Sequence, residues 1–210
     1  TAAKSVEELV SGADTLVVAF KPQHLAEADP RFAEWTNGKL VLSILAGKKL
    51  SSLVKVFPRA RNVVRTMPNT PGQIGAGITA WCARDPLAAA DQAIVEKILS
   101  ALGQSVAVAE TQMDAITAVS GSGPAYVYYF MEAMIQAGVK MGFTLSQAEL
   151  LVNQTFMGAV HLHNQSDLTC NDWISRVASK GGTTEAALKI MKGHTVDANI
   201  EEALFAAFNR

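Results

Sequence analysis

The chain has 210 residues, of which 49% are hydrophobic and 18% charged, and its 18 Lys and Arg against 19 Asp and Glu leave a net charge of −1. This length allows one large domain or two small ones, each with a proper core. The near-neutral charge excludes a broad positive field for nucleic acid. The low charged fraction indicates an interface that covers apolar surface.

The first half alternates apolar strands with helices. Ser5–Glu8 has the pattern of a capping box, which predicts a short helix ending at Gly12. Pro86 in a first turn and Gly103 after a last turn bound a longer amphipathic helix. Strands are expected at residues 14–20, 39–45, 62–67, 78–83 and 105–110, and helices at 51–57 and 86–102. This order predicts an α/β sandwich around a mostly parallel sheet.

Three loops follow the first three predicted strands, and in a parallel sheet ligands bind at that edge. They are AFKP (Ala19–Pro22), LAG (Leu45–Gly47) and MPNTP (Met67–Pro71). Each loop taken alone also fits a plain turn, because small residues and proline are common in turns of every kind.

After Glu110 the strand pattern ends and an all-helical region is predicted over residues 111–210. A second capping box is expected at Ser146–Glu149, and Gly142 is expected to end the preceding helix. Helices are expected at residues 113–119, 124–141, 146–163, 171–178, 184–192 and 196–209. The domain division is therefore 1–110 and 111–210.

The helix predicted from Pro124 to Met141 is apolar nearly all round. Such a helix must be covered on every side, and a domain of about 100 residues rarely covers one alone, so a homodimer through this region is expected. Burial within one subunit is the alternative. Glu132, Gln136 and Lys140 argue against a membrane span.

The segment VASKGGTTEAAL, from Val177 to Leu188, predicts a glycine-rich loop that opens a helix. Unpaired N–H groups and the positive end of the helix dipole can bind a carboxylate or phosphate there, while an ordinary turn between helices is the alternative. SGSGPAY (Ser120–Tyr126) follows a helix and lacks a Gly-Lys-Ser/Thr end, so it is no phosphate loop. Its Gly121 and Gly123 are expected to let two helices cross closely.

No metal site is expected. Cys82 and Cys170 lie far apart without ligand spacing and are expected to be free thiols, and His161 and His163 fall on different helix faces. The opening TAAKSVEELV has no basic head or apolar core of a signal peptide, so a cytoplasmic location is expected.

Three motifs together resemble the pyrroline-5-carboxylate reductase family: RTMPNTP with the later GAGIT, AVSGSGPAYVYYFMEAMIQAGVKMG, and VASKGGTTEAAL. The likeness extends over essentially the whole chain. It implies NADPH- or NADH-dependent reduction of the cyclic imine 1-pyrroline-5-carboxylate to L-proline. It also implies a Rossmann-like dinucleotide-binding domain over 1–110, incomplete at its N-terminus, and a helical substrate-binding and dimerisation domain over 111–210.

The resemblance assigns roles to particular residues. Thr117 would hydrogen-bond the ring nitrogen of the substrate, directly or through water, as the one catalytic candidate. The substrate carboxylate would be held by Ser179, Gly181, Gly182, Thr183 and Thr184. The cofactor would contact Ala19, Phe20, Lys21, Pro22, Ala46, Gly47, Asn69, Thr70 and Pro71.

Two departures from the family pattern stand out. The family's glycine-rich first βαβ unit has no counterpart in these residues, which is expected of a part of a longer protein or of a natural truncation, and the NADPH or NADH preference stays open. Lys180 replaces a proline common in the family. The alternatives are a non-catalytic dimeric fragment and a related imine or β-hydroxyacid dehydrogenase. A dehydrogenase of that kind is expected to carry a catalytic lysine on the long helix. The only lysine on that helix is Lys140, near its C-terminal end.

Overall fold

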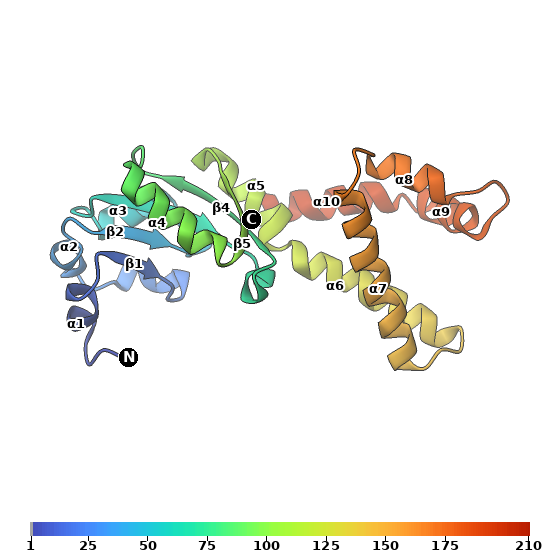
Figure 1. The fold of residues 1–210 in the computed structure, drawn as a ribbon, viewed down its shortest axis with the longest axis horizontal. Helices are drawn as coiled ribbons and strands as arrows, with labels where there is room; N and C mark the ends of the chain where they lie inside the picture. Colours follow the sequence, from blue (N-terminus) through green and yellow to red (C-terminus); the bar gives the residue numbers. More distant parts are fainter. Residues whose placement is uncertain (1) are drawn as a thin grey trace. The chain divides into compact units, whose positions relative to one another are not determined.

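A computed structural model describes residues 2–210, which form two compact units that meet in sequence between Pro124 and Ala125 (Figure 1). The first unit extends past the division expected after residue 110. The reason is that Met113, which is fully buried, belongs to the core of the sheet. The functional division into a dinucleotide domain and a substrate domain stays a prediction.

The first unit is built on a five-stranded sheet with the strands in sequence order. β1, β2 and β3 run parallel, β4 runs antiparallel to β3, and β5 runs parallel to β4. The sheet is thus mostly parallel, as predicted. The strands are β1 (Thr15–Val18), β2 (Leu40–Ser43), β3 (Asn62–Met67), β4 (Gly77–Ala83) and β5 (Gly103–Ala107).

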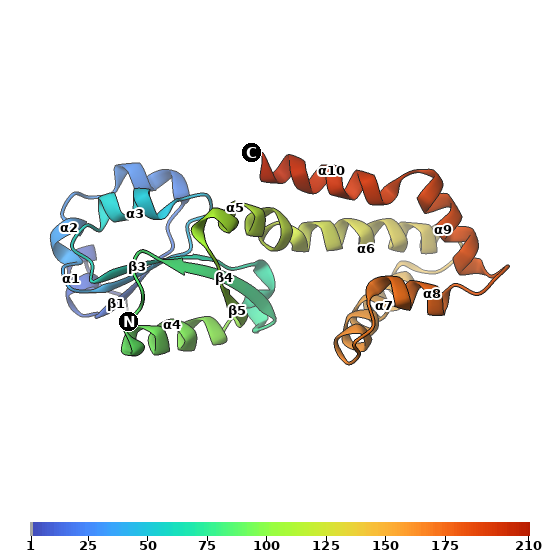
Figure 2. The same ribbon diagram turned by 90° about the horizontal axis from the view of Figure 1, so that it is seen from above.

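Alternating side chains of the central strands fill a core on each face of the sheet. Val41 and Val63 pack against α3 (Leu50–Val56) in a cluster that includes Phe57 and Met113. Leu40, Leu42 and Val64 point to the opposite face, where they meet Val95 and Leu99 of α4 (Ala89–Ser100). Figure 2 shows these two helices on opposite sides of the strands, which is the predicted α/β sandwich.

The remaining short elements of this unit are α1 (Val6–Ser11), α2 (Phe32–Trp35), α5 (Met113–Ile116) and 3-10 turns at Pro22–Glu27, Thr70–Ile74 and Glu110–Gln112. Ser5 caps α1 by accepting the Glu8 N–H at 3.1 Å, which confirms the predicted cap, but the Glu8 carboxylate accepts the N–H of Lys4 at 2.8 Å, so the reciprocal bond of a capping box is not formed. The expected start of α4 at Pro86 is wrong, since Ala88 is its N-cap. Gly103 does not end that helix either, because it is the first residue of β5 at φ 125°.

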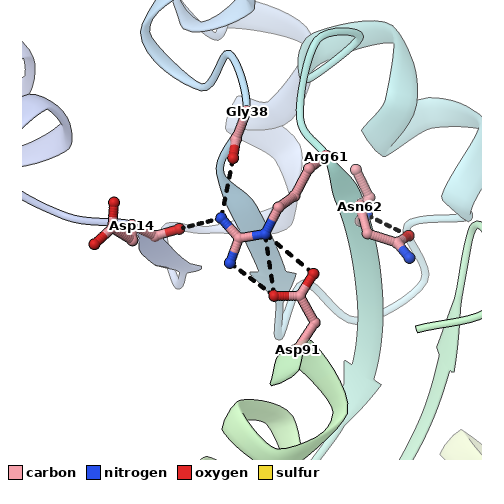
Figure 3. Close-up of polar contacts among 6 residues, drawn as sticks. Asp14, Gly38, Arg61, Asn62 and Asp91 are labelled. Atoms are coloured by element: carbon pink, nitrogen blue, oxygen red, sulfur yellow. Dashed lines mark hydrogen bonds and ion pairs between the residues drawn. The ribbon is translucent and has the colours of Figure 1, made fainter. Parts of the chain in front are cut away.

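An ion pair between the exposed Arg61 and the buried Asp91 ties the strands together at the amino ends of β1–β3 (Figure 3). The Arg61 guanidinium donates to both carboxylate oxygens of Asp91 at 2.7–3.0 Å, and to the carbonyl oxygens of Asp14 and Gly38 at 3.1 and 3.0 Å. The Asp91 carboxylate raises the pKa of Arg61. One side chain therefore links α4 with the residues that lead into three strands.

The segment after α5 continues as a π-helical turn over Thr117–Gly121, in which the Ser122 N–H donates to the Thr117 carbonyl at 2.9 Å. α6 (Gly123–Lys140) follows directly. The expectation that Gly121 and Gly123 let two helices cross is wrong. Gly121 lies instead against the side chain of Met67, and a β-carbon on Gly123 would meet nothing within 4 Å.

The second unit is all-helical, as predicted. The expected capping box at Ser146–Glu149 is wrong, because Thr144 is the N-cap: its Oγ1 accepts the Gln147 N–H at 3.3 Å and its own N–H donates to Gln147 Oε1 at 2.9 Å. Gly142, at φ 106°, follows α6 as expected. The later helices are α7 (Leu145–Asn164), α8 (Cys170–Val177), α9 (Thr183–Gly193) and α10 (Val196–Phe208).

Packing within the second unit is sparse. One cluster of buried residues, Ile135, Ala148 and Val152, joins α6 to α7. Gly138 allows this approach, since a β-carbon there would lie 3.2 Å from that of Ala148. Large apolar side chains of α6 stay exposed, among them Tyr128 and Tyr129 at 60% and 77%. Among the described residues, no helix is long and apolar enough to cross a bilayer.

Candidate functional site

The parallel pairing of β1, β2 and β3 brings the three candidate loops to one edge of the sheet. Val18 is level with Ser43, and Ser43 with Arg65, so β1 and β2 end together and β3 runs on to Met67 at the same edge. The backbone at this edge is open at Gly47, which is exposed at φ 71°. The structure thus brings together the expected cofactor residues, of which Ala19, Lys21, Ala46, Gly47 and Thr70 are exposed and Phe20, Pro22, Asn69 and Pro71 half-buried.

Asn69 is committed to the protein backbone. Its Oδ1 accepts the N–H of Ile78 at 3.0 Å, and its Nδ2 donates to the carbonyl of Ser120 at 3.3 Å. The amide therefore bridges the start of β4 and the π-turn. Within the first unit, this bridge places the MPNTP loop beside the segment that carries Thr117.

Thr117 is half-buried in the π-turn, and its hydroxyl already has an acceptor. Thr117 Oγ1 donates to the carbonyl of Met113 at 2.8 Å. The oxygen keeps lone pairs that can accept a hydrogen bond from a ligand N–H. Single π-turns inside helices are often found at functional sites, and no pattern in the sequence distinguished this one from an ordinary helix end.

The glycine-rich loop lies within the second unit and enters α9 through Gly182, its N-cap. Gly181 takes the left-handed conformation at φ 75°. Gly182 is packed so closely on Ser179 that a β-carbon would lie 2.6 Å from its Oγ. The N–H groups of Thr183 and Thr184 make no hydrogen bond to any described residue, so this helix start has donors to offer.

Glu185 occupies one of the backbone donors that the loop was expected to offer to an anion. Its Oε2 accepts the Gly181 N–H at 2.6 Å, so one of the backbone donors predicted to bind a carboxylate is bonded to a carboxylate of the chain itself. Gly181, Gly182 and Glu185 line a groove of about 920 Å³ between α8 and α9, together with Lys189 and Lys192. A small anion there would meet two lysines and would compete with Glu185.

A charge cluster centred on a buried arginine, with more exposed carboxylates, was missed from the sequence. Arg65 of β3, whose side chain is 3% exposed, pairs with Glu110 at 3.3 Å and with Asp114 at 3.2 Å. Burial raises the pKa of the neighbouring Cys82 thiol, which is therefore no thiolate nucleophile. Among residues 2–210 there is no group of His, Cys, Asp and Glu that could hold a metal ion.

Comparison with known proteins bears on both units. Residues 110–210 match the family described as pyrroline-5-carboxylate reductase dimerisation. Pyrroline-5-carboxylate reductase of Pseudomonas aeruginosa is 38% identical over 209 residues, which cover 99% of this chain and 77% of that protein. This chain belongs to the pyrroline-5-carboxylate reductase family.

Further members agree in sequence and in fold. The reductase of Synechocystis is 38% identical over 97% of this chain and 76% of its own length. The crystal structure of Plasmodium falciparum pyrroline carboxylate reductase with NADP bound superimposes with a TM-score of 0.92 at 31% identity, covering 99% of this chain and 79% of that one. The predicted family and the Rossmann-like fold class with a helical region after it are thereby confirmed.

Proposed function

We propose that this chain catalyses reduction of the C=N bond of 1-pyrroline-5-carboxylate to L-proline with NADPH or NADH. The observation that carries the proposal is family membership along both units, at 38% identity over 99% of the chain. A nicotinamide cofactor supplies the hydride when bound. The residues of the chain have to bind, orient and shield the reactants.

The edge of β1–β3 fits the nicotinamide half of such a cofactor. The left-handed Gly47 exposes backbone there, and the bridge made by Asn69 keeps Thr70 and Pro71 at the same edge. Ala19, Phe20, Lys21, Pro22, Ala46 and Gly47 form the rest of the proposed contact set. Ligands of parallel sheets bind at this edge.

Thr117 is proposed to orient the substrate nitrogen. Because its own hydrogen is donated to the Met113 carbonyl, the hydroxyl oxygen is an acceptor and prefers a ring nitrogen that carries a proton. A protonated imine is also the more electrophilic form. A threonine hydroxyl has no pKa suited to supplying that proton, so water or the substrate itself delivers it.

The loop of the second unit is proposed to bind the substrate carboxylate. Thr183 and Thr184 contribute backbone N–H groups that are free among the described residues, Ser179 and Thr184 contribute hydroxyls, and Gly181 and Gly182 let the carboxylate approach the backbone closely; the Gly181 N–H can donate to it only in competition with Glu185. Lys180 is exposed and points its charge toward solvent in this assignment.

The protein is further proposed to be a cytoplasmic homodimer. The apolar side chains exposed on α6 and the match to a dimerisation family support association through the second unit. The two cysteines, Cys82 and Cys170, are free, which suits a reducing compartment.

The test is oxidation of NADPH and of NADH, followed by absorbance, with 1-pyrroline-5-carboxylate as substrate and proline identified as product. Thr117→Ala is expected to lower kcat by about 10- to 100-fold, and Thr117→Ser, which keeps the hydroxyl, should retain most of it. Substrate and cofactor binding without turnover in the wild-type protein would support the non-catalytic alternative instead.

A further inference from the structure

The buried Arg65 lies on the same strand that ends in the MPNTP loop. β3 and its continuation present Arg65, Met67 and Asn69 at alternate positions, which share one side of an extended chain. Each of these residues contacts the segment that carries Thr117. Arg65 pairs with Asp114, Met67 packs on Gly121, and Asn69 donates to the Ser120 carbonyl.

Of these three contacts, the one made by Arg65 reaches the base of the π-turn. Asp114 follows Met113 in α5, and the Met113 carbonyl is the acceptor of the Thr117 hydroxyl. Any tilt of α5 therefore moves both the acceptor and the hydroxyl that the proposed reaction uses. The pairing at 3.2 Å limits that tilt.

Glu110 fixes the other end of the same guanidinium. Its Oε1 accepts from Arg65 at 3.3 Å and from the Leu50 N–H, at the start of α3, at 2.5 Å. Arg65 is thereby tied to the sheet, to α3 and to α5 at once. A guanidinium is suited to this task because its donors are held in one rigid plane.

We propose that Arg65 is a positioning residue of the reductase, which holds the π-turn, and with it the Thr117 hydroxyl, in register with the nicotinamide-side loop. This rests on the proposed function. Arg65 touches no reactant in this assignment, since it acts through Asp114.

The test uses Arg65→Met, which keeps the length of the side chain without its charge, and Arg65→Lys, which keeps the charge. Glu110 and Asp114 are 36% and 50% exposed, so Arg65→Met leaves no fully buried unpaired carboxylate, and the fold is expected to survive. Arg65→Met is expected to lower kcat by about 10- to 100-fold with the KM for NADPH nearly unchanged, and Arg65→Lys should recover part of the loss. Asp114→Asn, at an exposed carboxylate, should give a smaller loss of the same kind.

A double-mutant cycle separates positioning from general damage. In the Thr117→Ala background, Arg65→Met should cause no further loss of kcat, because the group it positions is gone. The matched control is Arg61→Met, which removes another paired arginine just before the same strand, far from the loop edge. Its effect should be equal in the two backgrounds. Additive losses for Arg65→Met would overturn the proposal.

Amide hydrogen exchange of residues 117–122 in the protein without ligands gives a readout that needs no turnover. Exchange should be faster in Arg65→Met than in wild type and unchanged in Arg61→Met. If wild type fails to reduce 1-pyrroline-5-carboxylate, the proposed function fails, and faster exchange would still support the hold on the turn. Unchanged exchange in Arg65→Met overturns the inference whatever the activity.

Discussion

The side-chain hydrogen bonds inside the first unit include ones between residues far apart in the sequence, whereas those inside the second unit join residues that are close in the sequence. In the first, side-chain hydrogen bonds join Arg61 to Asp91, 30 residues apart, and Glu110 to Leu50, 60 apart, around two buried clusters. In the second, every side-chain hydrogen bond among the described residues joins positions at most seven apart, as Trp173 to Ser166 does. One cluster of three buried residues is its core.

This difference indicates where the stability of each unit comes from. The first unit contains two apolar clusters and the buried Arg65, which is paired with two carboxylates. We expect these contacts to let it fold on its own. Helices that make only local contacts are marginal in water unless an apolar face is buried. The second unit is therefore expected to gain its stability by association with another copy.

The largest effect is expected from a charge on the exposed apolar surface of α6. Tyr129→Glu places a carboxylate where a tyrosine is 77% exposed in the single chain. If a second copy covers this position, each of the two subunits buries an unpaired charge, at a cost of roughly 3–5 kcal/mol per charge. We expect dissociation, measured by sedimentation, together with faster amide exchange in α7 and α8.

Leu9→Glu is the matched control for that variant. Leu9 on α1 is also exposed, at 56%, but it belongs to the unit that has its own core. Its assembly state should equal that of wild type. Dissociation by Leu9→Glu with no change in Tyr129→Glu would reverse the contrast between the units.

The next effect is a cavity in the first unit. Phe57→Ala removes a ring that is 1% exposed and packs edge-on against Phe32. Such a change costs about 3–5 kcal/mol. We expect a lower unfolding temperature of the first unit by calorimetry, with the mass of the assembly unchanged. A dimer that falls apart in Phe57→Ala would contradict independent folding.

The sequence predicted the strands and the helical character of the second half, although the first unit extends past the expected division after residue 110. Period-two and apolar runs placed all five strands, and β3 was bounded correctly at Asn62 and Met67. Predicted helix ends were wrong where another nearby residue makes the capping hydrogen bonds. Thr144 caps α7 because its reciprocal partner is Gln147, which the pattern Ser146–Glu149 did not anticipate.

The sequence predicted the loops of the candidate site, but not the residues that hold those loops in place. Glycine, proline and threonine spacing pointed to the loops near Asn69 and Gly181. The role of Arg65 could not be predicted, because its partner Asp114 lies 49 positions away and a lone arginine in a strand has no periodic signal. The π-turn at Thr117 likewise packs through Gly121 on Met67, a tertiary contact that no local pattern signals.

A smaller effect is expected at the loop of the second unit. Glu185→Gln keeps an acceptor for the Gly181 N–H and removes a negative charge from a groove that also contains Lys189 and Lys192. The KM for 1-pyrroline-5-carboxylate should fall by about two- to fivefold, in the range of exposed charge interactions, with kcat unchanged. The difference in KM between Glu185→Gln and wild type should become smaller in high salt, because salt screens the charge of Glu185.

Glu185→Ala separates charge from hydrogen bonding at this position. It removes the acceptor as well, so the loop loses the bond that holds Gly181, and the KM should rise above that of Glu185→Gln. Equal KM values for the two variants would mean that the Gly181 contact does not order the loop.

The smallest effect concerns a purely local contact, the cap of α8. Asp172 accepts from the N–H and the hydroxyl of Thr169 at 2.9 and 2.6 Å, and these bonds lower the pKa of its carboxyl. A lowered folded pKa means that the stabilisation is complete above the unfolded value, about 4, and is lost as pH falls through the lower folded value. Asp172→Asn should therefore loosen α8 at neutral pH and resemble wild type in acid.

Fluorine NMR of protein labelled with 5-fluorotryptophan can follow the loosening of α8, because Trp173 is the residue after Asp172. Its signal is assigned by replacing Trp35, Trp81 and Trp173 with Phe in turn. The Trp173 signal of wild type should shift toward that of Asp172→Asn only in acid. A pH-independent difference would mean that the contact acts through shape and not through charge. Among the described residues, no side-chain hydrogen bond connects α8 to a position far away in sequence. A parallel loss of the proposed dimer in acid would therefore indicate that this local cap also depends on association with a second copy.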